Sequence, residues 1–306
     1  MTATVAPTAT AVAAVKSKVR RGWTEHGLLF VAPFLLIYLV FLVWPTLLGF
    51  QMSFSSVNVA GGNDHFIGFG NYAEAFADPR MWRSLWNTLV FTVLSTIPLV
   101  LLGLVLALLV HHLRFMQWLW RLSFFGPFLL PSAVVSILWL QMIYPPEYGL
   151  INGTLGTDIV WLGDPSLAMW SVVLTTVWWT VGFNFLLYLA ALQSIPQHLY
   201  EAAAIDGANA WDKLRSITLP MLRRTTALIV VLQLVASLKV FDQIYLMTGG
   251  GPEDATRSII EYAYDIGFTG YRTGYASAVS YILFALIVIV SLAQLRLFRK
   301  REEVAS

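Results

Sequence analysis

Six stretches of the chain are long and apolar enough to cross a bilayer. A spanning helix needs about 20 mostly apolar residues, and a membrane bundle tolerates prolines because neighbouring helices satisfy the freed backbone groups. We therefore predict an all-α polytopic membrane protein with six transmembrane helices over 27–50, 88–110, 122–143, 168–191, 225–247 and 276–298. The remaining segments are predicted as an N-terminal tail (1–26), an outer loop (51–87) that precedes a core of five spans (88–298), and a C-terminal tail (299–306).

The basic residues between these stretches indicate the orientation. With both termini placed in the cytoplasm, 14 Lys and Arg residues lie in inner segments and four lie in outer ones, while Lys239 falls within the fifth span. Cytoplasmic loops carry the excess of Lys and Arg, so we expect both termini to be cytoplasmic. The first apolar run is too long for a signal peptide and lacks a small-residue cleavage site, which predicts a retained anchor.

Composition narrows the classes of function. Hydrophobic residues make up 58% of the chain and charged residues 12%, about half the usual quarter for a soluble domain. This excludes a cytosolic enzyme and a nucleic-acid binder. No cysteine is present, no lysine follows a glycine as a phosphate-binding loop requires, and the histidines form no HExxH motif. We expect no metal, no bound cofactor and no ATPase activity in this chain.

One pair of charges falls within the predicted spans. Asp242 is the one acidic residue in them, and it follows Lys239 at a spacing that puts both on one helix face. The two residues form either an outer-end ion pair that makes the lysine tolerable or part of an external gate on the substrate path. Ion-driven transport favours several buried acids or histidines, which the spans lack.

The longest inner loop, 194–220, carries a helical elbow. Ser194 is a predicted N-cap, a short helix is expected over 196–206, and Gly207 ends it, as glycine usually does after a helix. A second short helix is expected over 210–216. Such an amphipathic piece either fills a groove in a partner protein or lies on the membrane, and the residues alone leave both open.

The elbow carries the motif that resembles a known family. Glu201-Ala202-Ala203, Gly207, Ile217 and Leu219-Pro220 fill, at the right spacing, every position of the EAA signature of binding-protein-dependent ABC importer permeases. The segments 241–252 and 271–280 resemble the carbohydrate branch, the maltose and glycerol-3-phosphate permeases. The resemblance covers about residues 27 to 300. Arg223-Arg224 replace a proline that often follows the Leu-Pro pair, and a large outer domain is missing.

The resemblance implies the type I ABC importer permease fold and a heterodimeric permease. The expected partners are a second permease subunit, two ATPase subunits that hold ATP and magnesium, and an external solute-binding protein, in a prokaryotic plasma (inner) membrane. The residues implied to couple the elbow to an ATPase groove are Glu201, Ala202, Ala203, Asp206, Gly207, Ile217, Leu219 and Pro220. The expected cargo, moved by alternating access, is a disaccharide or an oligosaccharide. The alternative is an ion-coupled secondary transporter of a small polar solute.

Candidate substrate-path residues recur at helical spacing on two spans. The fourth span offers hydroxyl, amide and aromatic groups, the mixture that sugar sites use, and by resemblance sugar contacts fall here and in the middle of the fifth span. The candidates are Thr176, Thr180, Phe183, Asn184, Ser237 and Phe241. Threonine and serine also join membrane helices, and aromatic rings also pack, so a structural role is the alternative for each.

Overall fold

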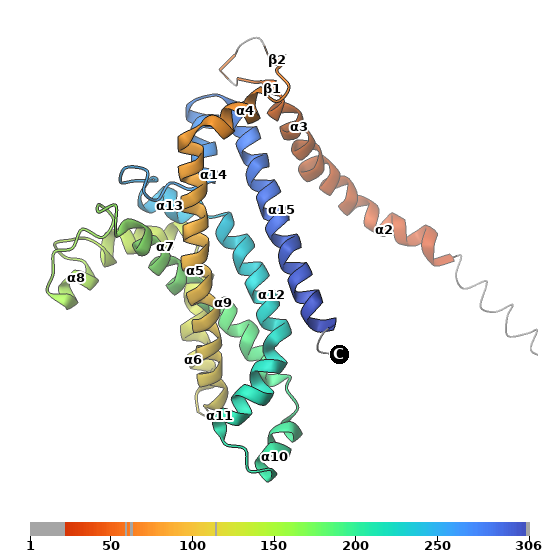
Figure 1. Cartoon of the computed structure of the whole chain (residues 1–306), viewed down its shortest axis with the longest axis vertical. Helices are drawn as coiled ribbons and strands as arrows, with labels where there is room; N and C mark the ends of the chain where they lie inside the picture. Colours follow the sequence, from red (N-terminus) through yellow and green to blue (C-terminus); the bar gives the residue numbers. More distant parts are fainter. Residues whose placement is uncertain (1–21, 59, 62–63, 114, 304–306) are drawn as a thin grey trace, which may run out of the picture. The chain divides into compact units, whose positions relative to one another are not determined.

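The computed structural model describes residues 22–303 apart from positions 59, 62, 63 and 114, and this part is mostly helical (Figure 1). Two short strands, β1 (Ser55–Ser56) and β2 (His65–Phe66), pair antiparallel. The α-helices are α2 (Gly22–Tyr38), α3 (Trp44–Ser53), α4 (Gly70–Ala77), α5 (Pro79–His112), α6 (Gln117–Phe125), α7 (Ser132–Leu138), α8 (Leu150–Leu155), α9 (Ala168–Gln193), α10 (Gln197–Ile205), α11 (Ala210–Lys213), α12 (Leu219–Leu238), α13 (Asp242–Met247), α14 (Ile259–Tyr264) and α15 (Thr273–Glu303). Shorter helical turns are η1 (Leu39–Val43), η2 (Gly126–Leu129), η3 (Trp139–Ile143), η4 (Leu214–Thr218) and η5 (Asp265–Thr269).

The chain divides into two compact units, one that ends at Met52 and one that runs from Ser53 onwards. In the first unit α2, η1 and most of α3 form a continuous apolar helical segment where we predicted the first span. Residues 1–21 of the predicted tail lie outside the described part, and residues 22–26 belong to α2. At the other end α15 continues to Glu303, so the predicted tail begins as an extension of this helix.

Five helical segments of the described part are long and apolar enough to cross a membrane. They are Phe30–Ser53, Pro79–His112, Ala168–Gln193, Ala210–Leu238 and Thr273–Gln294. A sixth is obtained when the bent pair Gln117–Leu129 and Ser132–Ile143 is counted as one span. Helices over the second, fourth and sixth predicted spans are confirmed.

The third predicted span is not one straight helix. Its two halves meet at an angle of 97°. Pro127 lies in the η2 turn and Pro131 follows Leu130, whose backbone is extended (ψ 140°). A residue that precedes proline is driven out of the helical region by steric clash, so Pro131 holds Leu130 in its extended conformation and the chain restarts as α7 after it.

The fifth predicted span is also divided. α12 ends at Leu238, and α13 begins at Asp242 after a non-helical backbone at Phe241 (φ −144°, ψ −62°). This break buries Ile244 and Met247 in the packed clusters beside α9 and α7. At its other end, the helix begins earlier than predicted, because α11, η4 and α12 are continuous from Ala210.

The expected second helix of the elbow, over 210–216, therefore does not stop before the fifth span. Pro220 lacks an N–H and sits within the first turn of α12. The wider η4 turn precedes it, where the Leu219 N–H bonds to the Leu214 carbonyl five residues back. Such a π-turn relieves the clash that a proline makes with the carbonyl four residues earlier, so the helix runs on through the proline.

α9 is the central helix of the second unit (Figure 1). It packs against α5, α6 and α12. In its most apolar stretch 61% of the residues are buried, against 22–33% in the corresponding stretches of α5, α12 and α15. A helix that is apolar all round is typical of the interior of a bundle. α9 is therefore positioned to line any internal cavity, while the other spans retain lipid-facing surfaces.

Polar contacts hold together the end of the unit that is remote from the elbow. Tyr262 and Tyr275 both donate to the Asp78 carboxylate, and the second of these bonds is 3.1 Å long. Arg272 forms a two-bond ion pair with Glu74 at 2.8 and 2.6 Å. These contacts join α4 and the start of α5 to α14 and α15, so the connection after α12 is tied to the bundle.

Candidate functional site

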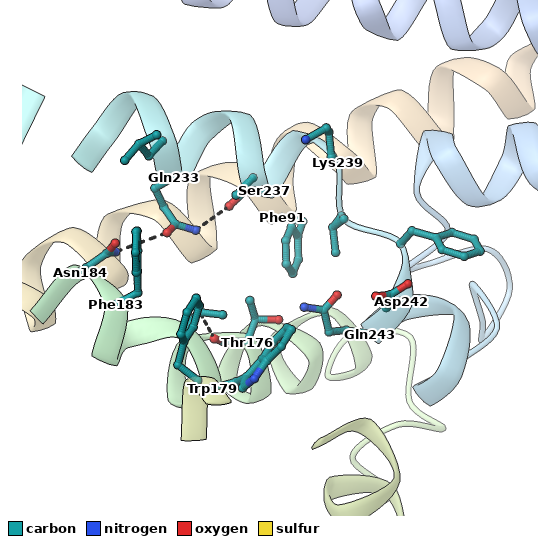
Figure 2. Close-up of a pocket in the computed structure, with 16 residues that line it drawn as sticks. Phe91, Thr176, Trp179, Phe183, Asn184, Gln233, Ser237, Lys239, Asp242 and Gln243 are labelled. Carbon is teal, nitrogen blue, oxygen red and sulfur yellow. Dashed lines mark hydrogen bonds between the residues drawn. The ribbon is translucent and has the colours of Figure 1, made fainter. Parts of the chain in front are cut away.

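A cavity of about 370 Å³ lies between α5, α9, α12, α13 and the η2 turn (Figure 2). All eight residues that the sequence suggested for the substrate path or the outer ion pair line it: Thr176, Thr180, Phe183, Asn184, Ser237, Lys239, Phe241 and Asp242. Helical spacing alone put four of them on one face of α9, and the break between α12 and α13 turns the others toward the same space. The structure therefore gathers the predicted residues around one cavity.

A chain of hydrogen bonds forms the polar wall of the cavity (Figure 2). The Asn184 amide donates to Gln233 Oε1 at 3.3 Å, and Gln233 Nε2 donates to the Ser237 hydroxyl at 3.1 Å. The Ser237 hydroxyl is 2.9 Å from that of Ser95 on α5. Because these groups are buried and already paired, they are held in fixed orientations toward a ligand.

Two threonines on α9 add hydroxyls to the wall opposite α12. Thr176 donates to the Val172 carbonyl at 2.8 Å, and Thr180 donates to the Thr176 carbonyl at 2.7 Å. Each hydroxyl proton is thus used within the helix, which is the usual bond of a mid-helix threonine. Their oxygen lone pairs remain as acceptors for a hydroxyl-bearing ligand in the cavity.

Aromatic rings form the apolar part of the wall. Phe183 stacks on Phe128, with ring centroids 5.2 Å apart and an interplanar angle of 23°. Trp179 Nε1 donates to the Leu130 carbonyl at 3.1 Å, which fixes its ring beside the bend between α6 and α7. Flat apolar rings next to fixed hydrogen-bonding groups are the combination found in small-molecule sites.

The predicted ion pair at the outer end of the fifth span is not formed. Lys239 is the C-cap of α12 and Asp242 begins α13, so one helix does not carry both. Asp242 Oδ2 instead accepts a hydrogen bond from the Ser132 hydroxyl at 2.7 Å. Within the described residues no salt bridge joins the two charges, which both line the cavity and are exposed. The alternative role, on the substrate path, fits this geometry better.

Gln233 and Trp179, which the same two spans offer beside the candidates, also line the cavity, and Gln233 shares a helix face with Ser237 four positions later. Six lining residues were not predicted, namely Phe91, Phe128, Leu232, Ala236, Val240 and Gln243. The sequence carries no signal for Phe91 and Phe128, because their place at the cavity follows from the packing of α5 and from the bend after α6.

The elbow is an exposed structure at the opposite end of α12 (Figure 1). Gly207 has φ +80°, its N–H bonds to the Ala204 carbonyl, and the Ala208 N–H bonds to the Ala203 carbonyl at 2.8 Å. This pair of bonds is the Schellman motif, whose left-handed position favours glycine. The predicted end of the first elbow helix at Gly207 is confirmed.

The predicted cap of that helix is wrong. Ser194 ends α9, where its hydroxyl donates to the Ala191 carbonyl at 2.7 Å, and Pro196 occupies the N-cap position of α10. A capping box is present one helix later. The Asn209 side chain accepts from the Asp212 N–H at 3.0 Å, and the Asp212 carboxylate accepts from the Asn209 N–H at 3.1 Å.

The elbow presents its signature residues to solvent. Glu201, Ala202, Asp206, Gly207, Leu219 and Pro220 are exposed, and Ala203 and Ile217 are half-buried. The most exposed large apolar side chain of the elbow is Ile205, with 87% of its surface accessible, and Trp211 is 65% exposed. Ile205 was not among the predicted contact residues. Exposed apolar side chains that cluster on one element are typical of a protein interface.

A bundle of apolar helices around a partly polar cavity, with an exposed helical elbow at one end, defines a membrane permease. The chain belongs to the family of binding-protein-dependent transport system inner membrane components, whose family model matches residues 67–303. It is therefore a permease component of an ABC importer.

Relatives and solved structures agree with this family. The chain is 34% identical over 290 residues to the sulfoquinovosyl glycerol transport system permease protein SmoG of Agrobacterium fabrum, covering 92% of this chain and 94% of the relative. It is 33% identical over 291 residues to the trehalose/maltose transport system permease protein MalF of Thermococcus litoralis, covering 94% and 98%. A bacterial ABC transporter that imports the acidic polysaccharide alginate matches with a TM-score of 0.80 and 26% identity, over 94% of this chain and 98% of that one.

Proposed function

We propose that this chain forms one half of the translocation pathway of an ATP-driven importer for a sugar or sugar-like solute. The transport systems named for its relatives carry sulfoquinovosyl glycerol, trehalose or maltose, and alginate. A second permease subunit, two ATPase subunits with ATP and magnesium, and an external solute-binding protein complete the complex. A solved alginate transporter contains such a pentasaccharide-bound periplasmic protein, which supports the last of these partners.

The observation that carries this proposal is the cavity with its mixed lining. Its acceptor hydroxyls, fixed amides and stacked rings suit the hydroxyl groups and apolar faces of a sugar ring. Thr176, Thr180, Asn184 and Ser237 supply the polar contacts, and Phe183 and Phe241 supply apolar ones. A volume of about 370 Å³ lies in the range of small-molecule sites.

The orientation is part of the proposal. With six spans, and the bent pair α6–α7 as the third, the elbow and both termini lie in the cytoplasm. The distribution of basic residues supports this arrangement. So does the topology, because the elbow precedes α12 and the α13–α14 connection follows it, which puts them at opposite ends of one span.

The exposed elbow is proposed to dock into a groove of an ATPase subunit. The left-handed turn at Gly207 gives the elbow the shape that enters this groove. ATP binding moves the elbow only if the closed ATPase pair binds ATP better than the open one. Glu201 offers a carboxylate to the partner, and Ile205 offers an exposed apolar side chain.

The test is Gly207→Asp in the complete complex, with uptake of solute and hydrolysis of ATP measured together. We expect normal insertion and assembly, with uptake below about a tenth of the unmodified rate. Gly156→Asp is the matched control, because Gly156 also has positive φ (+65°) at a helix C-cap with open space around it. Wild-type uptake in the Gly207 variant would refute the docking proposal. Uptake that stops when the proton gradient collapses, while ATP is present, would favour the ion-coupled alternative.

A further inference from the structure

The two halves of the elbow are joined by a side-chain hydrogen bond. The Tyr200 hydroxyl on α10 lies 2.9 Å from the Thr218 hydroxyl in the η4 turn. Thr218 is 5% exposed, and its own hydroxyl donates to the Lys213 carbonyl at 3.3 Å. Since that proton is used, Tyr200 is the donor in the bond between them. The bond therefore has one orientation and a buried acceptor.

This bond connects the two ends of the signature segment. Tyr200 directly precedes Glu201, and Thr218 directly precedes Leu219 and Pro220. The covalent route between them passes through the turn at Gly207, whose backbone adopts φ +80°. A glycine is the most conformationally free residue in a chain, so that route transmits displacement poorly, whereas the hydrogen bond bypasses it.

Beyond Thr218 the helix is continuous to the cavity. The segment Ala210–Leu238 is one helical unit of 29 residues, and its last two turns carry Gln233 and Ser237, which line the cavity. A rigid helix carries a movement at one end to the other. A shift of Thr218 thus reaches the polar wall described above.

We propose that the Tyr200–Thr218 hydrogen bond transmits the movement of α10 to α12, and that both are positioning residues for transport. The inference rests on the proposed docking of the elbow to an ATPase. In that setting, force applied at Glu201 passes through the neighbouring Tyr200 to Thr218, and the cavity end of α12 follows. Without the bond, α10 swings about Gly207, and ATP is hydrolysed with little effect on the cavity.

The test uses the absence of cysteine from the chain. Ala236 lines the cavity and is exposed, so Ala236→Cys in the assembled complex reports its opening through the rate of labelling by a maleimide. The rate is compared without nucleotide and after trapping with ATP and vanadate. Tyr200→Phe and Thr218→Val are each expected to reduce the nucleotide-dependent change about fivefold, which equals about 1 kcal/mol of coupling at 1.4 kcal/mol per factor of ten, while ATP hydrolysis continues.

Three comparisons separate transmission from general damage. Thr218→Ser keeps the hydroxyl and is expected to behave as the unmodified chain. Tyr72→Phe removes a similar bond, 2.8 Å to Ser53, away from the elbow, and is expected to change nothing in the labelling. The double variant of Tyr200 and Thr218 is expected to be no worse than either single one, because both remove the same bond.

Each outcome decides one way. An unchanged labelling response in Tyr200→Phe, or additive losses in the double variant, would overturn the inference. A normal response in Tyr200→Phe together with a lost response in Gly207→Asp would overturn the inference and leave the proposed function standing. If the Ala236→Cys complex with an otherwise unmodified elbow shows no change in labelling rate on adding nucleotide, the proposed function itself fails.

Discussion

The close approach of α6 to α9 at Gly182 allows a sharp prediction. A Cβ at this position would lie 2.2 Å from the Phe124 carbonyl oxygen and 2.7 Å from the Phe125 Cα. Both are backbone atoms of α6, so no side-chain rotation relieves the overlap. Small residues allow membrane helices to approach this closely, and Gly182→Ala is therefore expected to force the two helices apart.

The magnitude follows from the distances. Ordinary contact begins near 3.4 Å, so the Phe124 oxygen must move by about 1.2 Å. Overpacking of a well-packed interior typically costs 1–3 kcal/mol, and we expect about 2 kcal/mol here. The displaced segment also carries Phe128, whose ring stacks on Phe183 beside the cavity. The substitution should thus weaken solute transport as well as stability.

The assay is thermal unfolding of the detergent-purified complex, with uptake measured in parallel. Gly153→Ala is the matched control, because Gly153 lies inside α8 and its Cβ would meet nothing within 4 Å. We expect Gly153→Ala to unfold no lower than the unmodified protein and Gly182→Ala several degrees lower. Equal unfolding temperatures for the two variants would refute the packing argument.

Two further substitutions test other parts of the structure. Burial raises the pKa of Glu261 to about 7 from 4.5, with the charge of Asp265 adding to the effect and Arg257 opposing it. Between about pH 4.5 and 7 the folded protein keeps this proton and the unfolded chain releases it, so the stability of the fold falls as the pH rises through this range. Glu261→Gln should remove this pH dependence of the unfolding temperature. The same pH dependence in the variant and the unmodified protein would contradict the burial argument. Gln233→Leu breaks the hydrogen-bond chain between Asn184 and Ser237. It should raise the KM for uptake roughly tenfold, at about 1.4 kcal/mol for the lost hydrogen bonds. An unchanged KM would contradict a role of this chain in binding the solute.

Local rules predicted the parts of the site that depend on near neighbours. The Schellman turn at Gly207 requires three or four residues and a glycine, all visible in the sequence. The face of α9 that lines the cavity follows from helical spacing, which places Thr176, Thr180 and Phe183 together. The predicted cap at Ser194 was wrong because a serine hydroxyl suits both the last turn of one helix and the N-cap of the next. The length of α9 places Ser194 in the first of these roles.

The class of the protein, the approximate positions of its apolar helices and the elbow were predictable from the order of residues, because bilayer transfer and turn chemistry act on short segments. The places where the helices break depend on long-range packing. Hydropathy is a sum over the side chains of a segment. Its value is the same whether the segment with Pro127 and Pro131 is one kinked helix or two helices joined by a bend. The bend after α6 and the break at Phe241 exist because they bury Ile244 and Met247 and bring Asp242 to Ser132. The contact between Ser132 and Asp242 joins residues 110 positions apart, and sequence patterns over short windows carry no signal for it.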